Sequence, residues 1–500
     1  MLKIQDLTIT TNKGRVLLKD FSFVLNDNDK IALIGEEGNG KSTILKIIAG
    51  IDVSSYVSHE GQIIADGRIA YLPQTLDEED LRKDVASFIS DELEYGRLYS
   101  CAAGMKVDVT PLLERKMYTL SGGERVKISL LKILYQQPDM LLLDEPTNDL
   151  DLKTLIWLEE FIRNTDLPMI FISHDETLLE NCAEGILHLE QLKRKTESHI
   201  TFSGTDYRTY RKYRSDFIDK NNMIARKEKA EFNKQMEKWR KIYQRVDHEQ
   251  KTISRQDPHG GFLLKKKMHS VKAQGRQLEE KEKNLTKKYE PEEAIDIFFE
   301  HVDINPGKEI LRLHLPELTV DEKILAENID LTVFGNDKIC IIGDNGSGKS
   351  TLIKMIAETL LQRDDINAGY MPQNYWEVMD YDISPVDYLW DGYSIREKGK
   401  IQSYLGALKF TTEEMSHAIR ELSEGQKCKI LMVKMILDGN DVLILDEPTR
   451  NLSPLSNPRI RQILNEYEGC IISVSHDRKY IEEVADKVYE LDEDGLKLLM

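Results

Sequence analysis

A glycine-rich stretch that ends in lysine, serine and threonine occurs twice in this chain, as Gly35–Thr43 and again as Gly343–Thr351. Both copies fit the pattern G-x-x-x-x-G-K-S, and each lies between a short apolar run and a segment with helical spacing. Glycines let successive backbone N–H groups turn toward one anion, and the positive end of the following helix adds to that attraction. This context predicts two phosphate-binding loops rather than chance matches in glycine-rich turns.

Within these loops Lys41 and Lys349 are expected to reach the β- and γ-phosphates of a nucleotide, and the hydroxyls of Ser42 and Ser350 to hold Mg²⁺. The loop residues expected to bind the nucleotide are Gly35, Gly38, Asn39, Gly40, Lys41, Ser42, Thr43, Gly343, Gly346, Ser347, Gly348, Lys349, Ser350 and Thr351.

Paired acidic residues follow later in each copy, where Asp144-Glu145 and Asp446-Glu447 end apolar runs. An aspartate at the end of a buried strand suits the shell of Mg²⁺, and the glutamate after it is placed to polarise an attacking water. The alternative is a solvated turn after a strand. The preceding apolar residues and the following Pro-Thr, present in both copies, favour the catalytic interpretation.

His174 and His476 each follow a serine at the end of an apolar run, and Gln74 and Gln373 each end the pattern Tyr-x-Pro-Gln. A lone histidine is usually structural. Recurrence at matching positions predicts that the histidines contact the γ-phosphate and act in catalysis. It likewise predicts that the glutamines contact Mg²⁺ or its water.

The composition of the 500 residues, 40% hydrophobic and 31% charged, is that of a folded chain with large cores and argues against wholesale disorder. No apolar run reaches the roughly 18 residues that would predict a membrane span. The N-terminus alternates apolar and polar residues, which predicts a strand and not a signal peptide. Five scattered cysteines without a C-x-x-C pair argue against a disulfide framework or zinc ribbon and favour a reducing, cytoplasmic setting.

The elements that must position these residues repeat with the motifs. From Ser121 to His174, matching motif residues recur 302 positions later, which predicts a duplicated domain. Lys30–Gly35, Pro138–Asp144 and Pro168–Ser173 are predicted as buried strands, and Ser42–Ala49 as a helix. Short apolar strands alternating with helices indicate an α/β fold with a mostly parallel sheet covered on both faces.

Leu120–Glu124 reads Leu-Ser-Gly-Gly-Glu, and Leu422–Gln426 reads Leu-Ser-Glu-Gly-Gln. Together with the phosphate loops, these segments resemble the signature loops of the ATP-binding cassette superfamily. Two cassettes in one chain, joined by a charged segment, resemble the ABC-F group in particular. The resemblance covers nearly the whole chain and implies two P-loop cassettes that bind ATP and Mg²⁺ and hydrolyse ATP.

In that family the two cassettes close head to tail, and each ATP lies between one phosphate loop and the opposite signature loop. The resemblance thus implies a first site, in which the Gly35–Thr43 loop faces Ser423–Gln426. It implies a second site, in which the Gly343–Thr351 loop faces Ser121–Glu124. The nucleotide-binding residues implied in the signature loops are Ser121, Gly122, Gly123, Ser423, Glu424 and Gly425.

One loop departs from the family pattern. Asn148-Asp-Leu-Asp151 follows the first Asp-Glu-Pro-Thr, whereas Arg450-Asn-Leu-Ser453 follows the second, so Ser453 stands where an aspartate is expected. This loop is expected near the first site, and we therefore expect the two sites to differ in geometry and rate. We find no aromatic residue before either phosphate loop that is placed to stack on adenine.

The segment between the copies is basic in an acidic chain. Residues 206–289 hold 24 Lys and Arg against 12 Asp and Glu, a net charge of +12, while the whole chain carries −19. Two apolar seams at helical spacing predict an antiparallel helical hairpin, with a turn at Asp257–Gly261. The seam residues are Phe232, Met236, Trp239, Tyr243 and Val246 on the first helix and Leu264, Met268, Val271, Leu278 and Leu285 on the second. We expect one cassette at 1–205, the basic hairpin linker at 206–290 and a second cassette at 291–500.

Basic residues surround the expected tip, namely Arg255, Lys265–Lys267, Lys272 and Arg276, next to the apolar Phe262–Leu264. Such a tip suits a structured RNA pocket. The alternatives are a solvated lysine-rich helix face and apolar residues that merely cap the seam. The ABC-F resemblance favours RNA, because in that family the linker enters the ribosomal exit site and approaches the peptidyl-tRNA.

Three classes of function are compatible with two cassettes: a ribosome-binding ATPase, the ATPase subunit of a transporter and a DNA-repair ATPase. Transporter subunits do not need a basic hairpin between cassettes, and the repair enzymes carry zinc modules or much longer coils. We therefore expect a cytoplasmic ABC-F ATPase that binds the ribosome without a membrane or transmembrane subunit, as a monomer with intramolecular cassette pairing. Whether it serves general translation or antibiotic protection stays open.

Overall fold

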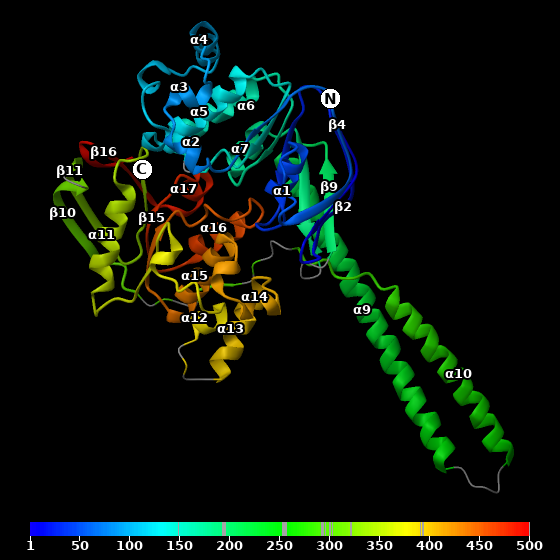
Figure 1. Cartoon of the computed structure of the whole chain (residues 1–500). Helices are drawn as coiled ribbons and strands as arrows, with labels where there is room; N and C mark the ends of the chain where they lie inside the picture. Colours follow the sequence, from blue (N-terminus) through cyan, green and yellow to red (C-terminus); the bar gives the residue numbers. More distant parts are fainter. Residues whose placement is uncertain are drawn as a thin grey trace. The chain divides into compact units, whose positions relative to one another are not determined.

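The computed structural model shown in Figure 1 describes residues 1–148, 150–192, 197–252, 258–291, 295, 297–299, 302, 304–320, 323–390, 392 and 395–499. The predicted Arg255 and Asp257 of the hairpin tip, and Asp149 in the loop after Thr147, lie outside these ranges. Packing divides the chain into two units, Met1–Arg208 together with Glu292–Met500, and Thr209–Pro291. No helix within the described ranges is long and apolar enough to cross a bilayer.

A six-stranded sheet forms the centre of the first half, in the order β5-β6-β7-β3-β8-β9. Its strands are β3 (Lys30–Ile34), β5 (Ile69–Leu72), β6 (Met140–Asp144), β7 (Met169–Ile172), β8 (Gly185–Gln191) and β9 (Glu197–Ser203). The first five strands in this order run parallel, and β9 is antiparallel to β8. Every residue of β3, β6 and β7 is buried, which explains why these strands read as continuous apolar runs.

A second, antiparallel sheet in the order β2-β1-β4 comprises β1 (Leu2–Thr11), β2 (Val16–Leu25) and β4 (Val57–Ala65). Its apolar face shares one core with helix α1 (Lys41–Ile48) and the central sheet. In β1 the buried residues shift from Leu2 and Ile4 to Leu7 and Ile9, because a register shift lies between Ile4 and Leu7.

Helices complete the first half. They are α1, α2 (Glu78–Arg82), α3 (Val85–Ile89), α4 (Tyr95–Gly104), α5 (Gly122–Tyr135), α6 (Leu152–Asn164) and α7 (Glu176–Cys182). Short 3-10 turns occur at Thr110–Leu112 and Met117–Thr119.

The second half repeats this arrangement, with a six-stranded sheet in the order β13-β14-β15-β12-β16-β17. Its strands are β12 (Lys338–Ile342), β13 (Ala368–Met371), β14 (Val442–Asp446), β15 (Cys470–Val474), β16 (Lys487–Asp492) and β17 (Gly495–Leu498), and a hairpin of β10 (Glu309–Val320) and β11 (Lys323–Phe334) precedes them. Its helices are α11 (Lys349–Leu361), α12 (Pro385–Leu389), α13 (Ile395–Ala407), α14 (Thr412–Ser416), α15 (Glu424–Asp438), α16 (Asn457–Glu466) and α17 (Arg478–Val484), with 3-10 turns at Tyr375–Glu377 and Ile419–Glu421. The predicted duplicated α/β fold is confirmed.

Two long helices, α9 (Tyr207–Thr252) and α10 (Pro258–Lys283), form the segment between the halves and lie side by side in Figure 1. They are antiparallel, because Lys229 pairs with Glu282 at 3.2 Å while Trp239 Nε1 donates to the Val271 carbonyl oxygen at 2.8 Å. All ten predicted seam residues are buried or half-buried. Gly275 admits the Trp239 ring, since a Cβ at this position would lie 2.9 Å from the indole.

The predicted turn at the hairpin tip is wrong in part. Pro258–Gly261 is not turn but the first turn of α10. Proline suits the first turn of a helix because the N–H it lacks would have no intrahelical partner there. Phe262 and Leu263 lie on the first turns of α10 and are 66% and 51% exposed.

Candidate active sites

Each phosphate loop joins a buried central strand to a helix, β3 to α1 and β12 to α11. The last loop residue before each helix, Gly40 or Gly348, has a φ of 95° or 97°, which strains any side chain other than glycine. Lys41 Nζ donates to two carbonyl oxygens of its own loop at 2.9 and 3.2 Å. Lys349 Nζ does the same at 2.9 and 2.8 Å. Both ammonium groups are therefore held over the loops in which an anion would lie.

A serine hydroxyl and an aspartate meet beside each loop. Ser42 Oγ donates to Asp144 Oδ1 at 2.9 Å, and the Tyr71 hydroxyl donates to Asp144 Oδ2 at 2.7 Å. Ser350 hydrogen-bonds Asp446 in the same way, yet Asp446 Oδ1 is buried without a hydrogen-bond partner among the described residues. Burial raises the pKa of Asp446 to about 6. Oxygen ligands of this kind, with an unsatisfied carboxylate oxygen, fit Mg²⁺.

The glutamate after the first aspartate is fully engaged. Gln74 Nε2 and Asn148 Nδ2 each donate to Glu145 Oε2 at 2.8 Å, and His174 Nε2 lies 3.2 Å from Oε1. Burial alone would raise the pKa of Glu145, but the attraction and hydrogen bonds of these neighbours, His174 foremost, lower it to about 2. Glu145 is thus ionised and already partnered by its own cassette.

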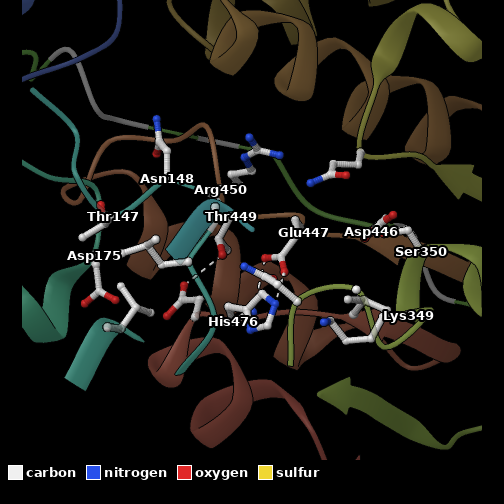
Figure 2. A pocket seen from close by; sticks show the side chains of 18 of the residues that line it. Thr147, Asn148, Asp175, Lys349, Ser350, Asp446, Glu447, Thr449, Arg450 and His476 are labelled. Atoms are coloured by element: carbon white, nitrogen blue, oxygen red, sulfur yellow. Dashed lines mark hydrogen bonds and ion pairs between the residues drawn. The ribbon is translucent and has the colours of Figure 1, made fainter. Parts of the chain in front are cut away.

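Its counterpart Glu447 has few partners (Figure 2). The backbone N–H of His476 donates to Glu447 Oε2 at a long 3.3 Å, and Oε1 is buried with no hydrogen-bond partner in the described part of the chain. Burial, followed by the neighbouring Asp446, raises the pKa of Glu447 to about 8. Burial and then Lys349 lower the pKa of His476 to about 4. Buried polar groups in this state are those that a bound ligand or ordered water would satisfy.

The second site contains a cavity of about 500 Å³, seen in Figure 2. Of the predicted residues it is lined by Gly122, His174, Gly346, Gly348, Lys349, Ser350, Thr351, Gln373, Asp446, Glu447 and His476. Gly122 and Arg125 come from the first half and begin helix α5, whose N-terminus is capped by Ser121. Val320 and Leu325 of the β10–β11 hairpin also line the cavity, so aliphatic side chains are available to a base.

Between the first phosphate loop and the opposite signature loop lies a small cavity of about 30 Å³. Of the predicted residues, Ser423 and Gly425 line it, together with Glu36 and Glu37 of the phosphate loop. Ser423 caps helix α15 through Gln426, as Ser121 caps α5 through Glu124. The structure thus places each phosphate loop opposite the other half's signature loop.

Some residues of the predicted set do not line either cavity. They are Gly35, Gly38, Asn39, Gly40, Lys41, Ser42, Thr43, Gln74, Ser121, Gly123, Asp144, Glu145, Gly343, Ser347 and Glu424. Glu424 instead pairs with Lys427 at 2.6 Å, and Ser347 Oγ is buried without a hydrogen-bond partner among the described residues.

Sequence reasoning missed the contacts that join the halves. Arg461, 1% exposed, donates to Glu176 of the first half at 2.6 Å and to Glu483 at 2.7 Å. It also missed Tyr71 as a ligand-orienting group, although the Tyr-x-Pro-Gln repeat contains it. A buried arginine carries no local signal, because its partner lies 285 residues away in the sequence.

A family model described as "ABC transporter" matches the chain twice, at residues 18–148 and 326–450, slightly more than half of its length. Among curated relatives, the ATP-binding protein Uup of Buchnera aphidicola (Schizaphis graminum) is 30% identical over 96% of this chain and 79% of its own. The ribosome protection protein VmlR of Bacillus subtilis is 29% identical over 97% and 86%. ABC transporter F family member 5 of Arabidopsis thaliana is 27% identical over 97% and 74%. The chain therefore belongs to the ABC-F family of ATP-binding cassette proteins and is an ATPase.

Solved structures agree on the fold. One titled RNase-L Inhibitor matches with a TM-score of 0.59 at 17% identity, over 99% of this chain and 90% of its own. An archaeal ribosome recycling factor, solved with a ribosomal stalk protein, matches with a TM-score of 0.59 at 17% identity over 97% and 87%. At this identity the likeness concerns the twin-cassette architecture alone.

Proposed function

We propose that the chain is a cytoplasmic ABC-F ATPase that binds the ribosome and uses its basic hairpin to modulate translation or to protect the ribosome from antibiotics. The observation that carries this proposal is the α9–α10 hairpin: a segment of net charge +12 in a chain of −19. Lys265–Lys267 are exposed beside the exposed Phe262 and Leu263. Basic side chains around an apolar tip suit folded RNA.

Relatives support the choice of the ribosome as the RNA. VmlR, which matches nearly this whole chain, is named a ribosome protection protein. The basic linker does not favour a transporter subunit or a DNA-repair ATPase, because either function would leave the positive charge of the hairpin unexplained. The peptidyl-tRNA is the ribosomal ligand that we propose for the tip itself.

At the second site, the roles follow from the geometry. We propose that Lys349 binds the β- and γ-phosphates, that His476 contacts the γ-phosphate, and that Glu447 orients the attacking water. Ser350, Gln373 and Asp446 would hold Mg²⁺, which neutralises charge on the phosphates when it is bound. The matching residues of the first site would take the same roles for a nucleotide that enters there.

ATP would then join the halves, because residues of both halves line the second cavity. Gly122 and Arg125 reach it from the first half and Lys349 from the second. Loss of the γ-phosphate removes contacts that the closed arrangement alone makes, so hydrolysis favours opening and release from the ribosome.

Ribosome binding is tested by co-sedimentation of the Glu145→Gln/Glu447→Gln variant with ribosomes in the presence of ATP. The substitutions keep the shape of both side chains and remove their charge, so the variant should bind ATP and stay on ribosomes longer than the wild type. Lys349→Ala, which should bind no nucleotide at the second site, serves as the control for ATP dependence. Equal sedimentation of both variants would refute ATP-dependent binding, and no sedimentation of either would refute the ribosome as partner.

The tip is tested separately by Phe262→Ser/Leu263→Ser. This variant should keep its affinity for ATP and ribosomes, because the lysines and cassettes supply those, and should lose drug tolerance or relief of stalled translation in cells. Tyr213→Ser is a matched control, since Tyr213 is a 65% exposed aromatic residue at the other end of the hairpin. Full cellular activity of the tip variant would mean that the active element lies elsewhere. Early unfolding would mean that the tip residues are structural.

A further inference from the structure

The two phosphate loops differ at the two positions after their first glycine. The first loop has Glu36 and Glu37 where the second has Asp344 and Asn345. Asp344 forms an ion pair with Lys153 at 2.7 Å, and the pair is exposed, with 58% of the Asp344 and 74% of the Lys153 side chain accessible to solvent. Glu36 is only 13% exposed. The first loop therefore carries two acidic side chains inside a site whose ligand is expected to be anionic.

The Glu36 carboxylate is bonded by three residues of the opposite cassette. Lys429 Nζ lies 3.0 Å from its carboxylate, Ser456 Oγ donates to it at 2.6 Å, and Ser453 Oγ donates to the same oxygen. Burial opposes ionisation of Glu36, but Lys429 and the two serines lower its pKa to about 2.

Ser453 is the residue that stands where the family pattern has aspartate, and its contact gives that departure a physical reason. At the equivalent place in the other site, the Asp151 carboxylate faces the backbone N–H of Asn345 at 3.5 Å. An aspartate at position 453 would set a second carboxylate against Glu36, which is unfavourable at this distance. Ser453 and Glu36 are thus complementary changes on the two sides of one interface.

Glu37 contacts the opposite signature loop. Its Oε2 accepts the backbone N–H of Gly425 in the opposite signature loop at 2.5 Å. Burial raises the pKa of Glu37, while the nearby His174, the Gly425 N–H and Lys41 act in the other direction. A backbone N–H of a signature loop that is expected to bind an anion is thus already bonded to a carboxylate of this chain.

We propose that Glu36 and Glu37 form an intramolecular latch that occupies the phosphate position of the first site and holds the first phosphate loop against the second signature loop without nucleotide. A nucleotide enters the first site only by displacing Glu37. The chain thus binds one nucleotide tightly, at the second site. The halves open and close at the second site, while the first phosphate loop stays against the opposite signature loop.

The latch is tested by equilibrium binding of a non-hydrolysable ATP analogue with Mg²⁺ to the full chain. The wild type should bind one nucleotide. Glu37→Asn, which copies the residue of the second loop, should bind two, with first-site affinity raised by at least about tenfold, or about 1.4 kcal/mol. Adding Lys349→Ala assigns the sites, because Glu37→Asn/Lys349→Ala should still bind one nucleotide and Lys349→Ala alone should bind almost none. Glu60→Asn, an exposed charge removal on β4 of the same half, is the matched control and should bind like the wild type.

A measurement without nucleotide completes the test. Hydrogen exchange at the Gly425 amide should be slow in the wild type and faster in Glu37→Asn, because the latch bond is lost. Retained second-site binding shows that the variant is folded. Two nucleotides of equal affinity in the wild type would overturn the latch, as would a Glu37→Asn variant that matches the wild type in both nucleotide number and exchange. None of these outcomes depends on ribosome binding.

Discussion

Glu447→Gln and Glu145→Gln should differ sharply in their effect on ATP turnover. Glu447 lines a cavity of about 500 Å³ and has one carboxylate oxygen without a hydrogen-bond partner among the described residues, whereas the Glu145 carboxylate is held by three neighbours. We therefore expect the second site to supply nearly all turnover. Loss of one positioned group that acts on the transition state lowers kcat by about 100-fold or more. Glu447→Gln should then leave about 1% of the wild-type rate, and Glu145→Gln should change it by less than about twofold.

The comparison is quantitative because two equal sites predict different numbers. If both sites hydrolysed ATP independently and equally, either single variant would keep about half of the rate and the double variant alone would be inactive. The assay is steady-state phosphate release at saturating ATP, together with equilibrium binding of ATP to each variant. Binding should be retained in both, because glutamine keeps the shape of glutamate and the phosphate loops are unchanged.

Two results would refute this reasoning. A half-active Glu447→Gln together with a half-active Glu145→Gln would show equivalent sites. An inactive Glu145→Gln with a fully active Glu447→Gln would place hydrolysis at the first site.

Other predictions concern pH, salt and the hairpin. The pKa of Glu447 is about 8 in the folded protein without nucleotide, above the ordinary value of 4.5. The stability that its neutral form contributes is therefore complete below about pH 4.5 and is lost as the pH rises toward 8. In denaturant unfolding without nucleotide, Glu447→Gln should therefore gain stability over the wild type between pH 5 and pH 8, up to about 1.4 kcal/mol per pH unit, and a constant difference would contradict this. Replacing Lys265–Lys267 with glutamine should weaken ribosome binding and make the slope of log K against log salt shallower by about 2 to 3, measured by co-sedimentation; an unchanged slope would mean that these lysines contact no phosphate. Gly275→Val should destabilise the hairpin by about 1–3 kcal/mol, because the added side chain meets the Trp239 ring, and hydrogen exchange in α9 and α10 should become faster. Gly261→Val is the control and should not have this effect, because nothing lies within 4 Å of the added Cβ.

Much of the fold was predictable, because repeated motifs and repeated periodicities agree. The predicted runs Lys30–Gly35 and Pro138–Asp144 contain the strands β3 (Lys30–Ile34) and β6 (Met140–Asp144), which are buried throughout, and buried strands have few choices besides apolar residues. The apolar seams of the linker were also predicted correctly, because apolar residues at a 3–4 spacing lie on one face of a helix, and this face packs against the partner helix. The antiparallel sheet β2-β1-β4 was harder, because the register shift in β1 interrupts its alternation.

The site was predictable only as far as single positions carry chemistry. Gly-Lys-Ser and Asp-Glu identify the residues that could hold Mg²⁺ and phosphate, whatever their surroundings. The difference between the sites depends on pairs such as Glu36 with Ser453, which lie 417 residues apart. Ser453 alone indicated that the first site is unusual, but the reason required the opposite cassette to be placed against it.

The lysines of the phosphate loops have a consequence for how tightly a nucleotide can be bound. A free lysine side chain carries about 2 kcal/mol of rotamer entropy, which a ligand normally has to remove when it orders the side chain. Lys349 is already held at 2.9 and 2.8 Å by carbonyl oxygens of its own loop, so this ordering is complete once the chain has folded. The incoming triphosphate therefore meets a cation that is already ordered. Preorganisation of this kind lowers the entropic cost of binding, so it favours tight binding of nucleotide at the second site.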